Sequence, residues 1–259
     1  MEYKNLLYSQ EQGLAVITLN RPKAYNALCA ELNAELEQLL ARLETDNEIK
    51  ALIVTGGKKV FAAGADIMEM AEADSLAAYR VSTIGHRNHD RLEDLPFPTI
   101  AAINGPALGG GFELALSCDF RIAGEKSILG LPEITLGIFP GAGGTQRLLK
   151  LVGPSRTKEL IFQGNPVSAA KALEIGIVNR VVPDDEVLAE AQKLAAEMMK
   201  RPRRAISLAK AAINTGINYP LSVGKQLEKT YFAMTFASPD QKEGMKAFIE
   251  KRPSKFTDQ

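Results

Sequence analysis

The sequence is poor in cysteine and histidine and contains no tryptophan. Its two cysteines, Cys29 and Cys118, are too few for a disulfide framework, so a reducing compartment is the simpler interpretation. The two histidines, His86 and His89, do not form a zinc-binding motif. These shortages exclude a disulfide-rich secreted scaffold and predict that no metal is bound.

Net charge is also absent, because 31 basic residues balance 31 acidic ones. Such a chain has no overall field to hold nucleic acid or an anionic membrane, although a local basic patch stays possible. No apolar run approaches the roughly 20 residues that span a bilayer, and residues 1–7 do not have the pattern of a signal peptide. We expect a cytoplasmic protein that binds neither nucleic acid nor membrane.

The 259 residues, 46% hydrophobic and 24% charged, have the composition of a globular protein with one large domain or two smaller ones. Apolar runs at 14–19, 51–55 and 99–103 predict strands. Between them, leucines recur at three- and four-residue spacing from 28 to 43, which predicts an amphipathic helix. This alternation predicts an α/β fold.

Beyond about residue 150 the strand signal nearly vanishes. Helical stripes cover 187–199 and 205–213, a third helix is expected after Pro220, and a fourth through 245–249. We therefore divide the chain into a core at 1–195 and a helical C-terminal region at 196–259. From the pattern alone, this region either packs on a core of its own or forms an oligomer surface.

Three glycine-rich segments are candidate sites, since the chain contains no Walker A motif, dinucleotide fingerprint or nucleophile elbow. Residues 61–66 end in Asp66, which can cap a following helix, and composition alone favours a tight strand-to-helix turn over a ligand site here. Residues 108–116 place three glycines before an apolar helix, whose free N–H groups suit a negative oxygen. Residues 130–144 form the third segment.

Two of these segments carry an isolated glutamate among apolar residues, Glu113 and Glu133. Each is either a structural or surface side chain, or a buried functional carboxylate. Together they suggest general acid/base chemistry beside an oxyanion hole, although spacing alone cannot bring them together. His86 and His89 are three residues apart on a predicted charged helix, and we expect them on a solvated face.

Five motifs in order resemble the crotonase family, the enoyl-CoA hydratases and isomerases. They are residues 20–28, 61–66, 109–113, 132–133 and 140–147, and the similarity continues through 240–252. The resemblance implies an α/β fold with a spiral of ββα units, followed by a helical trimerisation region. It also implies a homotrimer or a homohexamer, built as a dimer of trimers, that acts on acyl-CoA thioesters.

Site residues follow from the same resemblance. It implies that Glu113 and Glu133 are catalytic, with Glu133 giving a proton to C2 and Glu113 activating the water. Both glutamates are present, as in the hydratase branch, whereas the isomerase branch commonly works with one. The two oxyanion-hole amides, the CoA-binding segment and the glycine beside the attacking water make up the implied substrate-binding residues: Ala65, Asp66, Ile67, Met68, Gly110 and Gly141.

Two positions depart from the family pattern: Met68 replaces a frequent lysine and Leu131 a frequent glutamine. The CoA phosphates need local positive charge, for which Arg21, Lys23, Lys251 and Arg252 are candidates. Ordinary surface solvation is the alternative for each of these four cations.

The expected reaction is reversible hydration of short trans-2-enoyl-CoA to (3S)-3-hydroxyacyl-CoA in fatty-acid or butanoate metabolism. Coenzyme A belongs to the substrate, so no separate cofactor is expected. Three alternatives stay open: an enoyl-CoA isomerase or other lyase of this fold, an RNA-binding protein, and a catalytically silent CoA-binding scaffold.

Overall fold

The computed structural model describes residues 3–258. Its main sheet has six strands in the order β1-β2-β3-β4-β6-β9, of which β1 and β2 pair antiparallel and the others parallel. The strands span Leu6–Glu11, Leu14–Leu19, Ala51–Thr55, Thr99–Ile103, Phe120–Gly124 and Arg180–Val182. The predicted runs at 14–19, 51–55 and 99–103 are confirmed as β2, β3 and β4, and the last two are buried throughout.

A second, smaller sheet contains β5 (Pro106–Leu108), β7 (Ile128–Gly130) and β8 (Val167–Ser168). The successive strand pairs β4–β5 and β6–β7 are divided between the sheets. The first strand of each pair, β4 or β6, belongs to the main sheet, and the second, β5 or β7, to the smaller one. Each pair is followed by a helix, which confirms the α/β fold with ββα units. Two of the glycine-rich segments, 108–116 and 130–144, therefore begin at the end of the second strand of such a unit.

Helices pack against strands of both sheets. The leucine pattern predicts α1 correctly, because five of its leucines are buried: Leu32, Leu36, Leu39, Leu40 and Leu43. Helix α5 is kinked where Gly153 leaves the helical conformation. The core helices are α1 (Ala30–Thr45), α2 (Ile67–Met70), α3 (Ser75–Asp94), α4 (Gly110–Leu116), α5 (Gly144–Gln163), α6 (Ala169–Glu174) and α7 (Val187–Met199), with 3-10 turns η1 (Pro22–Ala24) and η2 (Pro132–Leu136).

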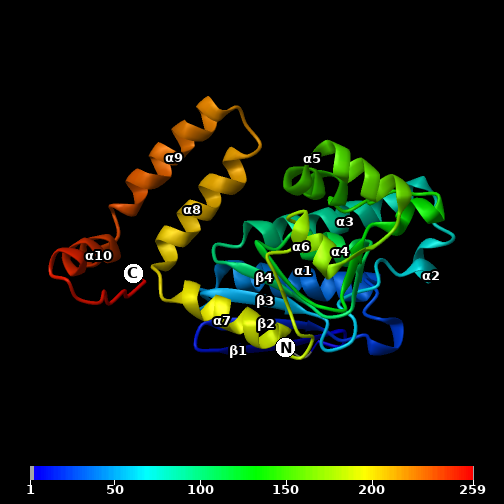
Figure 1. Cartoon of the computed structure of the whole chain (residues 1–259), viewed down its shortest axis with the longest axis horizontal. Helices are drawn as coiled ribbons and strands as arrows, with labels where there is room; N and C mark the ends of the chain where they lie inside the picture. Colours follow the sequence, from blue (N-terminus) through cyan, green and yellow to red (C-terminus); the bar gives the residue numbers. More distant parts are fainter. Residues whose placement is uncertain (1–2, 259) are drawn as a thin grey trace.

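The last three helices form an arm that extends away from the core (Figure 1). They are α8 (Arg203–Gly216), α9 (Leu221–Thr235) and α10 (Pro239–Ile249), which confirms the predicted helical content. Neither α8 nor α9 contains a buried residue. Helix α7, in contrast, packs on β3, β4 and β6, so the chain leaves the core between 199 and 203.

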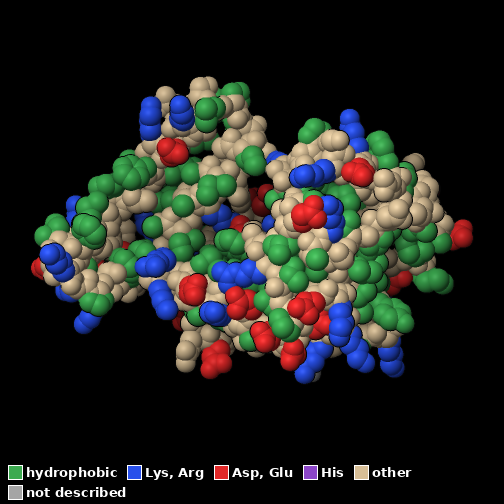
Figure 2. Space-filling model, in the orientation of Figure 1, with side chains coloured by type: hydrophobic (Ala, Val, Ile, Leu, Met, Phe, Trp, Pro, Cys, Tyr) green, Lys and Arg blue, Asp and Glu red, His purple; other side chains and the backbone are tan. Residues whose placement is uncertain are grey.

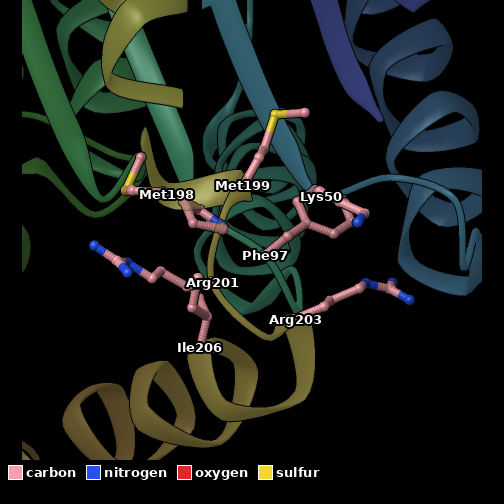
Figure 3. A pocket seen from close by; sticks show the side chains of 8 residues that line it. Lys50, Phe97, Met198, Met199, Arg201, Arg203 and Ile206 are labelled. Atoms are coloured by element: carbon pink, nitrogen blue, oxygen red, sulfur yellow. The ribbon is translucent and has the colours of Figure 1, made fainter. Parts of the chain in front are cut away.

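The arm is fixed to the core at the start of α8. Figure 3 shows the crevice at this junction, with Phe97 and Ile206 in it and the side chains of Arg201 and Arg203 extending to opposite sides. Farther along α8, Lys210 donates to Asp119 at 2.8 Å, and the same carboxylate oxygen accepts from the backbone of Thr99 at the start of β4. These contacts tie α8 to the end of the main sheet at which the central strand β4 begins.

No helix within residues 3–258 combines the length and the apolar character needed to cross a bilayer. Cys29 and Cys118 are both free thiols and both buried. Burial raises the pKa of Cys118 to about 12, so it stays a neutral thiol in the core.

Candidate active site

Two loops of the core meet at Ala65 and Gly110. A methyl group placed on Gly110 would lie 3.5 Å from the Ala65 nitrogen, so the two backbones are in close contact. The loop at 64–66 is held by Leu28, which donates to the Gly64 carbonyl at 2.8 Å and accepts from the Asp66 N–H at 3.2 Å. Within residues 3–258, the N–H groups of Ala65 and Gly110 donate to no protein acceptor. The structure therefore brings together the two amides predicted for an oxyanion hole.

Glu133 lies beside these amides. It is on η2, and its Oε1 would be 3.3 Å from a methyl group on Gly109, the residue that precedes Gly110. Gly109 has φ 51° and ψ −131°, a conformation that favours glycine. Because no side chain fills this position, the Glu133 carboxyl approaches the start of α4 closely.

Glu113 is on α4, one turn after Gly110, and is only 3% exposed. Its Oε1 accepts from the N–H of Ala142 at 2.8 Å and from that of Gly144 at 2.7 Å. Burial raises the pKa of Glu113, while these two N–H donors act in the opposite direction. Glu113 is therefore a buried carboxylate with backbone partners, and the surface alternative for it is wrong.

The Glu133 carboxyl has a different environment. Its Oε2 is buried and has no hydrogen-bond partner within the described residues. Burial, together with a smaller effect of the nearby Glu113 carboxylate, raises the pKa of Glu133 to about 7. The two acids thus lie near enough to interact electrostatically. Glu133 holds its carboxyl proton to a higher pH than an ordinary glutamate does.

The 140–144 turn, which supplies both donors to Glu113, is held from α3. Ser82 donates to the Gly141 carbonyl at 2.6 Å, and His89 Nδ1 lies 2.9 Å from the Ala142 carbonyl oxygen. Arg147 also donates to the Ala142 oxygen at 3.3 Å, while its guanidinium pairs with Asp90 and Glu93. Sequence reasoning did not identify Ser82, His89 or Arg147 as contacts of this turn.

The expectation that His89 is on a solvated face is wrong, because the side chain is 1% exposed. The charged neighbours Arg87, Asp90 and Arg91 led to this error. The spacing of Asn88, His89 and Leu92 could have indicated the burial, because these three residues share the buried face of α3. His86, the other histidine, is partly exposed.

The predicted CoA-binding segment lies at the start of α2. Asp66 caps this helix by accepting from the Met68 N–H at 3.2 Å, as the sequence predicts, and it pairs with Arg21 at 3.0 Å. Ile67 and Met68 are exposed, Met68 by 88%. These two side chains form an apolar edge next to Ala65. Lys23, in the 3-10 turn η1, is exposed.

Gly141 lies in the exposed part of the 140–144 turn, with open space around its Cα. It is thus accessible next to Glu113, the position that the resemblance implies. Leu131, the other departure from the family pattern, is 1% exposed and part of the main hydrophobic core.

The two remaining candidate cations lie elsewhere. Lys251 and Arg252 follow α10, at the end of the molecule opposite α2 (Figure 1). Arg252 also pairs with Glu243 and with Glu250, each at 2.7 Å. The structure therefore does not bring Lys251 and Arg252 to the Ala65–Met68 segment of the same chain.

This fold, with two amides and two glutamates in one site, is that of an acyl-CoA enzyme family. The chain belongs to the enoyl-CoA hydratase/isomerase family, whose model matches residues 9–259. A crotonyl-CoA hydratase of Syntrophomonas wolfei is 42% identical over 99% of both chains. A short-chain-enoyl-CoA hydratase of Clostridium acetobutylicum is 44% identical over 97% of both. The crystal structure of an enoyl-CoA hydratase from Bacillus anthracis superposes with a TM-score of 0.95, at 40% identity, and covers 99% of this chain and 100% of that one.

Proposed function

We propose that this protein is an enoyl-CoA hydratase that adds water reversibly to short trans-2-enoyl-CoA thioesters, such as crotonyl-CoA. The product expected from the family is the (3S)-3-hydroxyacyl-CoA, and the metabolic setting is fatty-acid or butanoate breakdown or synthesis. The observation that carries the proposal is the convergence of Glu113 and Glu133 on two free backbone N–H groups. The names of the two bacterial relatives support the short acyl chain.

The two amides determine where the thioester binds. Addition of water to C3 moves negative charge onto the thioester oxygen, which becomes enolate-like. The N–H groups of Ala65 and Gly110 would donate to this oxygen and stabilise the charge as it develops. One such donor is commonly worth ~10²–10³ in rate. The chemistry needs no metal or redox cofactor, because the coenzyme A of the substrate supplies the thioester.

The two glutamates move the protons. Glu113 is held by two N–H donors, which favour its ionised form, so it is suited to take a proton from the attacking water. Glu133, with its pKa raised to about 7, is suited to deliver a proton to C2. The water oxygen thus forms a bond to C3 and the proton from Glu133 forms a C–H bond at C2. The pair of glutamates ends with its proton on Glu113.

Coenzyme A would extend from the amides along the exposed edge made by Ile67 and Met68. Arg21 is already paired with Asp66, so it holds this edge in place and has little freedom to bind phosphate. Lys23 is the exposed cation of the early loop and the better candidate for a phosphate contact. Met68 contributes apolar contact where many family members have a cation.

We further propose that the arm joins copies of the chain as a homotrimer, or as a hexamer of two trimers. Figure 2 shows hydrophobic side chains along the outer surface of the arm. The hydrophobic side chains of α8–α10 with the greatest exposed fractions are Ile213, Leu221, Phe232, Phe248 and Ile249. The proposed cytoplasmic location rests on the two unpaired thiols.

The decisive experiment incubates the pure protein with crotonyl-CoA and follows the loss of absorbance of the conjugated thioester. Hydration at a rate that depends on enzyme concentration supports the proposal. The same protein with a 3-enoyl-CoA tests for isomerisation, which would increase that absorbance. If crotonyl-CoA is not hydrated, the proposed function is wrong.

A further inference from the structure

The peptide groups of the 140–144 turn are held from two sides. The carbonyl of Gly141 and the N–H of Ala142 belong to one peptide group: the carbonyl accepts from Ser82 and the N–H donates to Glu113. The carbonyl of Ala142 belongs to the next peptide group and accepts from His89. Helix α3 and the Glu113 carboxylate thus fix the direction of two successive peptide planes.

The contact geometry determines the tautomer of His89. A carbonyl oxygen can only accept, so the nitrogen that faces it, Nδ1, must carry the proton. Burial lowers the pKa of His89 to about 4, which leaves the ring neutral at pH 7. Its Nε2 is then unprotonated, and this atom is buried without a hydrogen-bond partner among the described residues. Packing alone would favour an apolar residue here, so the Nδ1 donor is the feature that distinguishes a histidine.

Close packing makes the turn sensitive to these contacts. A methyl group on Gly85, which lies on α3 between Ser82 and His89, would be 2.9 Å from Cβ of Ala142. The backbone of α3 at Gly85 therefore packs directly against the Ala142 side chain, and the turn has little room to move except away from α3. Arg147 cannot replace His89, because its 3.3 Å contact is longer and its guanidinium is shared with Asp90 and Glu93.

A cavity of about 360 Å³ adjoins the turn on the side of Arg147. Side chains of α3, α5 and α8 line it, among them His86 and Asn214. On this side the turn is therefore not held by close packing, and hydrogen bonds contribute its support. Of the two side-chain donors to the Ala142 carbonyl, His89 makes the shorter contact.

We propose that Ser82 and His89 are positioning residues, which orient the 140–144 turn so that its N–H groups hold Glu113 in the geometry needed to activate water. This inference rests on the proposed hydratase activity for its role in catalysis. Neither residue is among the proposed substrate contacts. Each acts through the backbone, by fixing the peptide that donates to the Glu113 carboxylate.

The test uses a pair of variants at one position. In His89→Asn the amide nitrogen can replace the Nδ1 donor, whereas in His89→Leu the donor is lost. We expect His89→Leu to lower kcat for crotonyl-CoA by ~10–100-fold with KM changed less than threefold, since a slightly misplaced catalytic group costs rate. His89→Asn should recover most of kcat. Ser82→Ala should lower kcat by several fold, and Thr83→Ala, whose hydroxyl contacts only the Tyr79 carbonyl of α3 itself, should not.

A crystal structure of each variant gives a readout that does not depend on activity. We expect the distance from the Ala142 nitrogen to Glu113 Oε1, now 2.8 Å, to exceed hydrogen-bond length in His89→Leu and to be retained in His89→Asn. An unchanged distance and an unchanged kcat in a folded His89→Leu protein would overturn the inference. Equal loss of kcat in both folded variants would also overturn it, because the donor would then not matter. Inactivity of the unsubstituted protein would instead refute the hydratase proposal and leave the distance measurement as the test of positioning.

Discussion

The Glu113 and Glu133 sides of the site are built differently, although both carry the same side chain. Glu113 lies on a helix, is almost fully buried and accepts two backbone N–H groups. Glu133 lies on a 3-10 turn whose neighbours Ile134 and Leu136 are exposed, and its Oε2 has no partner within residues 3–258. Burial raises the pKa of both acids, but at Glu113 two backbone N–H donors oppose that rise. The sites thus differ in the donors that favour the ionised form of Glu113.

The first way to test this difference is to remove each carboxylate charge. Glu113→Gln and Glu133→Gln keep the shape but abolish proton transfer, so we expect kcat for crotonyl-CoA to fall by ~10²–10⁴ in each. The protein should still bind crotonyl-CoA, measured by calorimetry. A near-normal rate for either variant would remove that residue from the mechanism.

The two amides can be tested separately from the acids. Gly110 is the first residue of α4, where proline is well tolerated, so Gly110→Pro removes the N–H without breaking the helix. We expect a fall of ~10²–10³ in kcat, the usual effect of one lost oxyanion-hole donor. Gly110→Ala retains the N–H and measures how much of the fall comes from the added side-chain atom near Ala65. Activity of Gly110→Pro equal to that of an active Gly110→Ala variant would show that this amide does not stabilise the thioester oxygen.

A pH profile then compares the two acids in one protein. Hydration needs a proton on Glu133, whose pKa is about 7, and an ionised Glu113. We expect kcat/KM to fall about tenfold per unit well above pH 7. Dehydration starts from the same singly protonated pair with its proton on Glu113, so the alkaline decline should occur at the same pH in both directions. Declines at different pH values would show that the two acids do not share one proton.

The sequence predicts the secondary structure of the core well, because β2, β3 and β4 are continuous apolar runs and α1 is a regular leucine stripe. It also marks Glu113 and Glu133 as unusual acids. It cannot predict their meeting, which depends on how two ββα units pack and on the 140–144 turn. The family resemblance supplied that expectation. His89 was missed since its burial comes from a turn more than fifty residues away.

The smallest effect concerns stability. Because the folded-state pKa of Glu133 is raised, the folded protein loses stability as pH rises from about 4.5 through 7, where this buried acid ionises. Glu133→Gln does not ionise, so it should be about 1 kcal/mol more stable than the unsubstituted protein at pH 8, after allowance for solvent screening. Thermal melts at pH 5 and pH 8 measure this gain. Equal gains at both pH values would contradict the assignment.

The contact of Lys210 with Asp119 has a consequence for how the molecule unfolds. Since Asp119 also holds the first residue of β4, α8 cannot detach without breaking the ion pair of a carboxylate that anchors a strand of the main sheet. Helix α8 is thus expected to open in one cooperative step with the main sheet, although by position it belongs to the arm. Local opening should begin beyond it, at α9, where amide hydrogens would exchange first.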